Sequence, residues 1–311
     1  MKLISIVVPC YNEEESIPSF YKECINVIKK IKNVKYEIIF VNDGSKDNTL
    51  NILKKYSKID SNVKYISFSR NFGKEAAMLA GLKYANGDYI TLMDADLQDP
   101  PHLLIEMYSK IQKEKVDCVI ARRKNRIGEP KIRSFFARKF YTIISKMAKL
   151  NIADGERDFR LMTRQLLDSI LELNEYNRFF KGLFSYVGYN VEYIEYSNVL
   201  RKNGKTKWSF FSLLKYGIEG IVSFSTMPLI ISTFIGLIFF IISVIFVIVI
   251  FVKTLIYGDP VAGWPSLACI ILFSSGIQLL CFGIMGEYLA KLYLETKSRP
   301  IYIVKETNIN R

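Results

Sequence analysis

The segment YITLMDADLQDPP, from Tyr89 to Pro101, passes from a run of apolar residues into two carboxylates and then into a double proline. The apolar part, which ends at Met93, has the length and composition of a buried β-strand. The two prolines stop regular structure, so Asp94 and Asp96 stand where this strand ends. Carboxylates in such a place can hold a hard divalent cation, which keeps phosphate oxygens of a substrate among its ligands. An acidic turn in solvent gives the same pattern, so the surrounding segments have to distinguish a metal site from a plain turn.

Predicted strands and helices alternate through the first part of the chain. Apolar, β-branched runs predict strands at residues 3–8, 36–41, 64–68, 89–93 and 116–120, and helical patterns lie between them. Such alternation is typical of an open, largely parallel α/β sheet. In these sheets ligands bind beyond the carboxyl ends of the strands.

Polar turns follow three of the predicted strands, after Val8, after Val41 and after Met93. If the strands are parallel, all three turns open into one crevice. We therefore group four acidic residues into one expected site: Glu13, Asp43, Asp94 and Asp96. The alternative is that these acids lie on unrelated loops of the surface.

Residues 122–139 form a strongly basic segment with aromatic and apolar residues between the charges. A basic helix with an aromatic face is typical of a helix that lies in the headgroup plane of an anionic membrane. An amphipathic helix of a soluble core gives the same pattern, so both interpretations stay open. If the membrane interpretation holds, interfacial helices are expected near 132–148 and 210–226.

Two long uncharged runs lie at residues 229–252 and 264–286. The first, at about 24 residues and 1.5 Å per residue, is longer than a bilayer core of about 30 Å. Two spans put both flanking segments on one side of a membrane, and the lysine and arginine residues outside the spans favour the cytoplasm for that side. We therefore expect a large domain at 1–227, a two-helix transmembrane region at 228–290 and a cytoplasmic tail at 291–311.

The chain of 311 residues carries a formal net charge of +13, and half of its residues are hydrophobic. This combination fits a protein that meets an anionic membrane surface or a phosphorylated substrate. A basic chain can also bind nucleic acid, but no nucleic-acid-binding motif is present, so we expect no nucleic acid partner. No charged residue lies deep within either uncharged run, which argues against a transport pathway.

Several motifs, taken in order, give the chain a family resemblance. VVPCYNEE from Val7, VNDGSKD from Val41 and DADLQDPP from Asp94 resemble the nucleotide loops and the metal motif of family 2 glycosyltransferases with the GT-A fold. DFRLM from Asp158 and the two apolar runs are similar to the polyprenyl-phosphate glycosyltransferases, which include dolichol-phosphate mannose synthase and the bactoprenol glucosyltransferases. The resemblance covers nearly the whole chain. It implies an α/β fold, with a GT-A (Rossmann-like), mostly parallel sheet followed by two transmembrane helices.

The resemblance also implies roles for individual residues. Asp94 and Asp96 would hold Mg²⁺ or Mn²⁺ on the donor diphosphate, and Asp158, together with Asp96, would be catalytic. The residues implied to bind the nucleotide sugar donor are Pro9, Tyr11, Glu13, Val41, Asp43, Asp94, Ala95, Gln98, Arg201 and Lys207. The basic residues expected at the acceptor phosphate are Arg122, Arg126 and Arg133. The chain departs from the family at His102, where relatives commonly have Glu, and at residues 155–157, which replace the usual Thr-Gly before Asp158.

The implied activity is that of an inverting, membrane-bound glycosyltransferase. It would move a sugar from a nucleotide sugar, UDP-glucose in the bactoprenol branch, to polyprenyl (undecaprenyl) phosphate, and so give a lipid-linked sugar for the glycosylation of cell-envelope polymers. UDP-N-acetylglucosamine and GDP-mannose stay open as donors. The implied location is the plasma membrane, with the catalytic domain and both termini cytoplasmic, and two short-looped spans allow self-association into a homo-oligomer.

Two other activities fit the sequence less well. A processive polysaccharide synthase is disfavoured because the chain lacks a Q-x-x-R-W motif and further spans. A non-catalytic membrane adaptor of the same fold would need a broken set of acids, and all four expected acids are present.

Overall fold

The computed structural model describes residues 1–124, 155–197, 222, 225–257 and 263–309. The chain divides into two compact units, of which one is Met1–Leu214 with Arg299–Arg311 and the other is Lys215–Ser298. The interfacial helix expected near 132–148, and most of the one expected near 210–226, lie outside the described residues.

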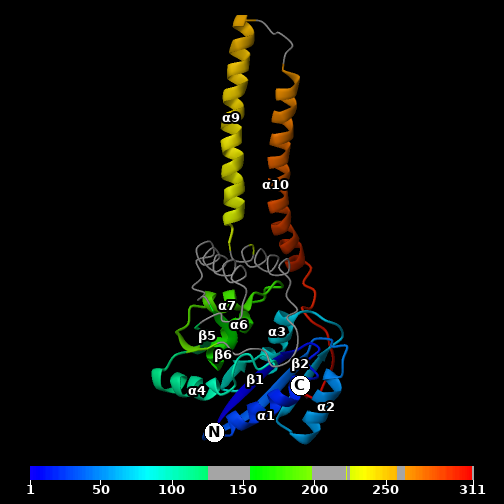
Figure 1. The fold of residues 1–311 in the computed structure, drawn as a ribbon, viewed down its shortest axis with the longest axis vertical. Coiled ribbons are helices and arrows are strands. Elements are labelled where there is room, and N and C mark those ends of the chain that lie inside the picture. Colours follow the sequence, from blue (N-terminus) through cyan, green and yellow to red (C-terminus); the bar gives the residue numbers. More distant parts are fainter. Residues whose placement is uncertain (125–154, 198–221, 223–224, 258–262, 310–311) are drawn as a thin grey trace. The chain divides into compact units, whose positions relative to one another are not determined.

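One eight-stranded sheet forms the centre of the first unit (Figure 1). Its strand order is β7-β5-β6-β4-β1-β2-β3-β8. The strands are β1 (Lys2–Cys10), β2 (Val34–Asn42), β3 (Val63–Phe68), β4 (Tyr89–Leu92), β5 (Cys118–Arg123), β6 (Glu156–Thr163), β7 (Val191–Tyr196) and β8 (Val304–Thr307). Strands β4, β1, β2 and β3 are parallel to one another, and so are β5 and β7. Strand β6 lies antiparallel between β4 and β5, and β8 pairs antiparallel with β3. The expected mostly parallel α/β sheet is confirmed.

Helices cover both faces of this sheet. Those described in the first unit are α1 (Ile17–Ile28), α2 (Thr49–Ile59), α3 (Lys74–Tyr84), α4 (Leu103–Glu114), α6 (Arg164–Glu172) and α7 (Phe180–Tyr186). Along β1, Ile4, Ile6 and Val8 join a core with α1 and α4, whereas Val7 on the other face lies against Gly81 of α3. A Cβ on Gly81 would be 2.2 Å from Val7 Cγ1, so glycine lets α3 lie close to the sheet. Burial on both faces explains the continuous apolar runs of these strands.

A buried carboxylate ties the central strands together. Glu37 of β2, which is 4% exposed, forms an ion pair with Lys64 of β3. It also accepts hydrogen bonds from Ser5 Oγ of β1 and, at 2.7 Å, from Asn86 N. Burial alone would raise the pKa of Glu37, but Lys64 and the other donors outweigh burial and lower it below its ordinary value. The ionised carboxylate therefore links β1, β2 and β3.

The second unit contains two long apolar helices, α9 (Met227–Tyr257) and α10 (Trp264–Thr296). Segments of both are long and apolar enough to cross a membrane by length and composition, with mean hydropathies of 3.5 for Met227–Tyr257 and 1.3 for Phe273–Thr296. Leucine, isoleucine and phenylalanine side chains are exposed along both helices. Apolar surface of this extent is typical of helices that meet lipid or another protein. The uncharged runs recognised in the sequence are thus helical where the structure describes them.

Residues that follow α10 take part in the sheet of the first unit. Helix α10 ends at Thr296, and β8 pairs with β3 at the edge of the sheet. The Nζ atom of Lys54 lies 2.7 Å from Glu306 Oε2, and Asn308 Oδ1 accepts a hydrogen bond of 2.7 Å from Tyr65 N. The segment expected as a tail from residue 291 onward therefore contains the end of α10 and an edge strand, β8.

Candidate active site

The turns after β1 and β2 are held together by hydrogen bonds between side chains and backbone. Asn12 links them in both directions, since its N–H donates to Ser45 Oγ at 2.9 Å and its Oδ1 accepts from Lys46 N at 2.8 Å. Glu13 N donates to Thr49 Oγ1 at 2.9 Å. The parallel register of β1 and β2 puts both turns at one edge of the sheet, which is the edge where ligands bind in such folds.

Asp43, in the turn after β2, is almost fully buried at 3% exposure. Its two carboxylate oxygens accept hydrogen bonds from Phe72 N at 2.6 Å and from Gly73 N at 3.0 Å. The backbone of Arg70 packs on Gly44, where φ is +63° and a Cβ would be 2.4 Å from Arg70 C. Burial raises the pKa of Asp43, although the two amides favour the carboxylate. Asp43 thus fixes the β3–α3 loop, residues 69–73, against the turn after β2.

A lysine joins two carboxylates at the carboxyl end of β4. Lys74, the first residue of α3, has its Nζ atom 2.7 Å from Asp94 Oδ1 and 2.6 Å from Asp158 Oδ2. The antiparallel register pairs Leu92 of β4 with Arg160 of β6. Two residues further along this register, Asp94 falls opposite Asp158. The pairing of β4 with β6 therefore brings both carboxylates to one place.

The charges of this group govern its ionisation. Burial would raise the pKa of Asp158, but Lys74 and Lys181 outweigh burial and hold it well below its ordinary value. At Asp94 burial exceeds the attraction of Lys74, so its pKa is raised. Burial would lower the pKa of Lys74, and the two carboxylates raise it above its ordinary value. Asp158 is therefore an anion and Lys74 a cation at neutral pH.

The loop after β4 is anchored by a second, buried acid. Asp96 Oδ1 accepts a hydrogen bond of 3.0 Å from Gln98 N within this loop. Asp99, which is 1% exposed, accepts hydrogen bonds from Arg157 Nε at 3.0 Å and from the hydroxyl of Tyr196. Asp99 was not among the predicted site residues, and it holds the loop that carries Asp96 against β6 and β7.

The other predicted site residues have varied surroundings. Val41 is buried against α3 and Ala95 belongs to the core, so both side chains face the protein interior. Arg122 of β5 has its Nη1 atom 3.9 Å from Glu195 Oε1 of β7, and His102 is exposed at the start of α4. The residues that lie partly exposed at the first turn are Pro9, Tyr11 and Glu13. The predicted residues that fall outside the described part of the chain are Arg126, Arg133, Arg201 and Lys207.

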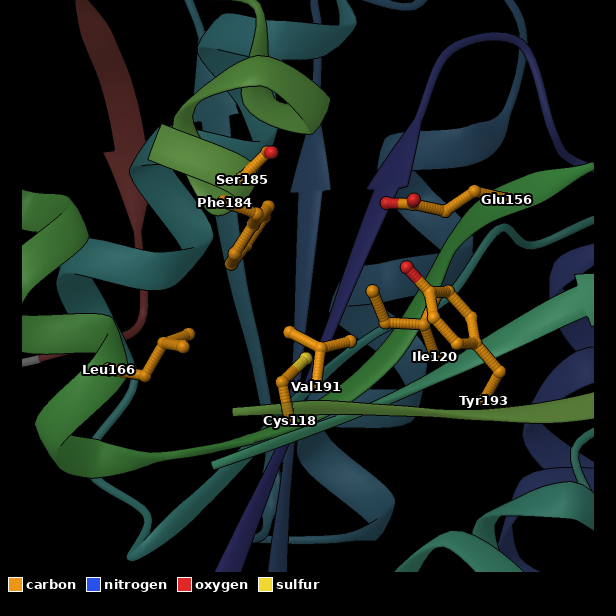
Figure 2. Close-up of a pocket in the computed structure, with 8 residues that line it drawn as sticks. All are labelled: Cys118, Ile120, Glu156, Leu166, Phe184, Ser185, Val191 and Tyr193. Carbon is orange, nitrogen blue, oxygen red and sulfur yellow. The ribbon is translucent and has the colours of Figure 1, made fainter. Parts of the chain in front are cut away.

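A small cavity lies among β5, β6, β7, α6 and α7 (Figure 2). Its volume of about 20 Å³ is enough for a single water molecule. The residues that line it are Cys118, Ile120, Glu156, Leu166, Phe184, Ser185, Val191 and Tyr193. Glu156 pairs at 3.1 Å with the buried guanidinium of Arg160. Neither Asp94 nor Asp158 lines the cavity, so it is separate from the group around Lys74.

Sequence comparison decides the family of this chain. The family model described as Glycosyl transferase family 2 matches residues 5–171, which is more than half of the 311 residues. The chain belongs to glycosyl transferase family 2. The match spans Lys74, Asp94 and Asp158 but ends before α9, α10 and β8. The expected membership of this family is confirmed, and the protein is a glycosyltransferase.

This glycosyltransferase is similar to bacterial relatives over nearly its full length. A Bacillus subtilis protein that bears the name glycosyltransferase CsbB is 46% identical over 309 residues, which cover 99% of this chain and 92% of that one. The SfII prophage-derived bactoprenol glucosyl transferase of Shigella flexneri is 41% identical over 305 residues, with 98% of each chain covered. The prophage bactoprenol glucosyl transferase homolog of Escherichia coli is 42% identical over 302 residues, with 97% of this chain and 98% of that one covered.

Among solved structures, the glycosyltransferase is similar to glucosyl-3-phosphoglycerate synthase from Mycobacterium tuberculosis, with a TM-score of 0.47 and 19% identity over 71% of this chain and 78% of that chain. It is also similar to S. aureus TarS, residues 1–349, with a TM-score of 0.43 and 21% identity over 62% of this chain and 58% of that chain.

Reasoning from the sequence located the acids but missed Lys74. A lysine on the first turn of a helix is disfavoured by the helix dipole, because the amino-terminal end of a helix is partly positive. Lys74 stands in that position and contacts two acids outside the helix. A cation in this unfavourable place, directly after a glycine, was the signal that could have revealed it.

Proposed function

We propose that this glycosyltransferase transfers glucose from UDP-glucose to polyprenyl phosphate at a membrane, and that the lipid-linked product serves the glycosylation of a cell-envelope polymer. Two relatives named for bactoprenol glucosyl transfer match the chain at 41% and 42% identity. Because these matches cover 97–98% of the chain, they include the apolar helices as well as the sheet. The donor sugar and the lipid acceptor of the proposal follow from those names.

The observation that carries the proposal is the group formed by Lys74, Asp94 and Asp158, with Asp96 two residues from Asp94. One cation lies within 2.7 Å of two carboxylates at the carboxyl end of β4. A departing nucleoside diphosphate gains negative charge in the transition state, and preorganised positive charge stabilises it. We assign this role to Lys74, which is 39% exposed and so accessible to a ligand.

The carboxylates of Asp94 and Asp96 suit a divalent cation that is shared with the donor. Mg²⁺ commonly takes one or two protein carboxylates and fills its other positions with water and substrate phosphates. In the described part of the chain, no cluster of three or more His, Cys, Asp or Glu side chains is arranged to hold a metal. A pair of carboxylates therefore fits an ion that the diphosphate helps to bind. When bound, Mg²⁺ or Mn²⁺ would act as a Lewis acid on the leaving diphosphate.

Asp158 is better suited to orienting a reactant than to removing a proton. Its pKa lies well below the ordinary range, and such a weak base accepts protons poorly at neutral pH. A phosphate monoester has a second pKa of about 6 and is already mostly ionised, so the proposed acceptor needs little help from a base. Direct attack of its oxygen would invert the anomeric centre and give a β-linked product from an α-linked donor.

The membrane part of the proposal rests on α9 and α10. We place them across the plasma membrane, with the sheet and both chain termini in the cytoplasm, because lysine and arginine residues outside the apolar runs favour that side. Basic side chains would then meet phosphates near the membrane surface. Those proposed for the acceptor are Arg122, Arg126 and Arg133, and those proposed for the donor are Arg201 and Lys207.

The test is a donor panel with the full-length protein in lipid or detergent. Purified protein is mixed with short-chain polyprenyl phosphate and with radiolabelled UDP-glucose, UDP-N-acetylglucosamine or GDP-mannose, and lipid-linked radioactivity is counted. We expect turnover with UDP-glucose, loss of turnover with EDTA, and loss in Asp96→Asn. The matched control is Asp168→Asn, because the Asp168 side chain is 59% exposed on α6. Faster transfer from another donor would overturn the glucose assignment, and UDP binding without any transfer would point to the adaptor.

A further inference from the structure

We propose that the C-terminal segment, residues 302–308, positions the donor side of the active site, and that Tyr302 is its main contact. The segment would act through the β3–α3 loop, which contacts Asp43 and leads directly into Lys74. The statement that this side of the site binds the donor rests on the proposed function. The mechanical statement, that the segment holds the loop, stands on the contacts alone.

Hydrogen bonds anchor the far end of the segment to β3, and an ion pair anchors it to α2. The hydroxyl of Thr307 donates to Tyr65 O at 2.7 Å, and Tyr65 N donates to Asn308 Oδ1, also at 2.7 Å. Glu306 adds its ion pair with Lys54. The ladder between β8 and β3 becomes irregular between Ser67 and Phe68. Regular pairing therefore stops just before the β3–α3 loop, where a ring stack and a backbone hydrogen bond connect the two segments instead.

At the end near the loop, the segment contacts β3 through an aromatic ring and a backbone carbonyl. Tyr302 stacks on Phe68 with ring centroids 4.9 Å apart and an angle of 14° between the rings. Phe68 in turn meets Phe72 edge to face at 5.8 Å. Ser69 N donates to Ile303 O at 3.0 Å. The C-terminal segment thus contacts Phe68, the last residue of β3, and Ser69, the first residue of the β3–α3 loop.

The β3–α3 loop connects the C-terminal segment to the active site. The N–H groups of Phe72 and Gly73 both donate to the carboxylate of Asp43. The next residue, Lys74, reaches the carboxylates of Asp94 and Asp158. A shift of the Phe72 ring would therefore disturb the two hydrogen bonds to Asp43. It would also displace the backbone next to Lys74, which contacts both Asp94 and Asp158.

A purely structural edge strand would not need this arrangement. Hydrogen bonds of the ladder protect the edge of β3 whatever side chain stands at position 302. The stacked ring instead covers Phe68, which is 2% exposed, where the chain leaves the sheet for the site. Residues 302–308 lie beyond the family match, which ends at residue 171.

The experiment compares Tyr302→Ala with Tyr302→Phe in the full-length protein. The matched control is Ile303→Ala, because this neighbouring side chain is 53% exposed. Hydrogen–deuterium exchange at the amides of Phe72 and Gly73 reports on the loop without any substrate. Steady-state assays with UDP-glucose report KM and kcat. We expect Tyr302→Ala to speed exchange at the two amides and to raise KM about threefold to tenfold with little change in kcat, the range for loss of one aromatic pair.

The proposal also requires that Ile303→Ala behave as the unmodified chain and that Tyr302→Phe depart from it less than Tyr302→Ala does, because both variants keep the stacked ring. Unchanged exchange in Tyr302→Ala would overturn the mechanical statement even if no donor were ever turned over. Faster exchange without a change in KM would overturn only the link to the donor. If Tyr302→Ala does not fold, Tyr302→Leu keeps apolar bulk without the stack and is measured in its place.

A second comparison separates the stacked ring from general loss of β8. Thr307→Ala weakens the anchor at Tyr65, at the far end of the segment. We expect it to speed exchange in β3 but to leave KM within about twofold of the unmodified chain. An equal rise of KM in Thr307→Ala and Tyr302→Ala would show that the segment only stabilises the sheet, and would overturn the role given to Tyr302.

Discussion

Replacing Lys74 by methionine is expected to tighten the binding of Mn²⁺ while it slows turnover. Methionine keeps much of the length of the side chain and removes its charge. That charge lies 2.7 Å from Asp94 Oδ1 and 3.0 Å from Asp94 Oδ2. Lys74 therefore competes with any cation that Asp94 would hold, and the same change removes a cation from Asp158.

The size of the effect follows from these distances. A small divalent ion lies about 2.1 Å from a carboxylate oxygen, so an ion on either oxygen of Asp94 is at most about 5 Å from Lys74 Nζ. Charges of +2 and +1 at about 5 Å repel by about 1.7 kcal/mol in water. The dielectric constant of water gives the lower limit of this repulsion, because the Lys74 side chain is only 39% exposed and the two acids are less exposed still. Removal of the lysine should therefore lower the Kd for Mn²⁺ by at least about fifteenfold.

The assay is a titration of Mn²⁺ into purified full-length protein, with the free ion counted by electron paramagnetic resonance. Lys83→Met is the control, because Lys83 is exposed at the other end of α3, beyond a Debye length of about 8 Å at physiological salt. Turnover of UDP-glucose should fall at least about tenfold in Lys74→Met, through loss of one charge-assisted contact. Unchanged or weaker Mn²⁺ binding in Lys74→Met, or equal tightening in Lys83→Met, would refute this reasoning.

Three further outcomes are expected. Glu37→Gln should destabilise the protein by about 2 kcal/mol through its lost pairing with Lys64. Because the pKa of Glu37 is lowered in the fold, this stability is present above about pH 4.3 and is lost as the pH falls through the folded pKa, so melting curves of the two proteins should converge in acid. Gly81→Ala should cost about 1–3 kcal/mol by overpacking, since its Cβ would be 2.2 Å from Val7 Cγ1, and an unchanged melting temperature would contradict this packing. Asp158→Asn should lower kcat without changing the pH dependence of kcat near neutrality. An apparent pKa near 7 that the unmodified enzyme shows and Asp158→Asn lacks would instead make Asp158 a base.

Much of the sheet could be read from local sequence. Strands β1, β2, β3 and β4 are buried on both faces over much of their length, so they appear as largely apolar runs. The turns after them are rich in Asn, Asp and Gly, which mark the ends of strands. Parallel order then follows from the helices in between, and with it the expectation that Asp43 and Asp94 lie at the same edge.

The contacts that define the site could not be read in this way. Asp94 faces Asp158 because β6 pairs antiparallel with β4, and no local pattern records the direction or register of a strand that arrives after a long insertion. Asp43 was expected to bind the donor, and its local sequence did not show that both of its oxygens accept backbone N–H groups of the β3–α3 loop. These partners lie about 30 residues away in the chain and depend on tertiary packing.

Strand β8 is a case in which the signal was present but was not used. Residues 301–304 read Ile-Tyr-Ile-Val, a β-branched and aromatic run of the kind found in strands, and its last residue, Val304, is the first residue of β8. Its position after two apolar helices favoured its assignment to a tail. The pairing of β8 with β3 joins residues more than 200 positions apart, and only the folded chain shows such a contact.

The position of β8 has a consequence for biosynthesis. A ribosome has to translate both apolar helices before residues 304–307 exist, so β3 emerges with a bare row of N–H and C=O groups that waits for its neighbour. Such a row recruits strands from other nascent chains. A message cut short after α10 would leave it bare permanently, and the resulting fragment is expected to aggregate or to be removed by proteases.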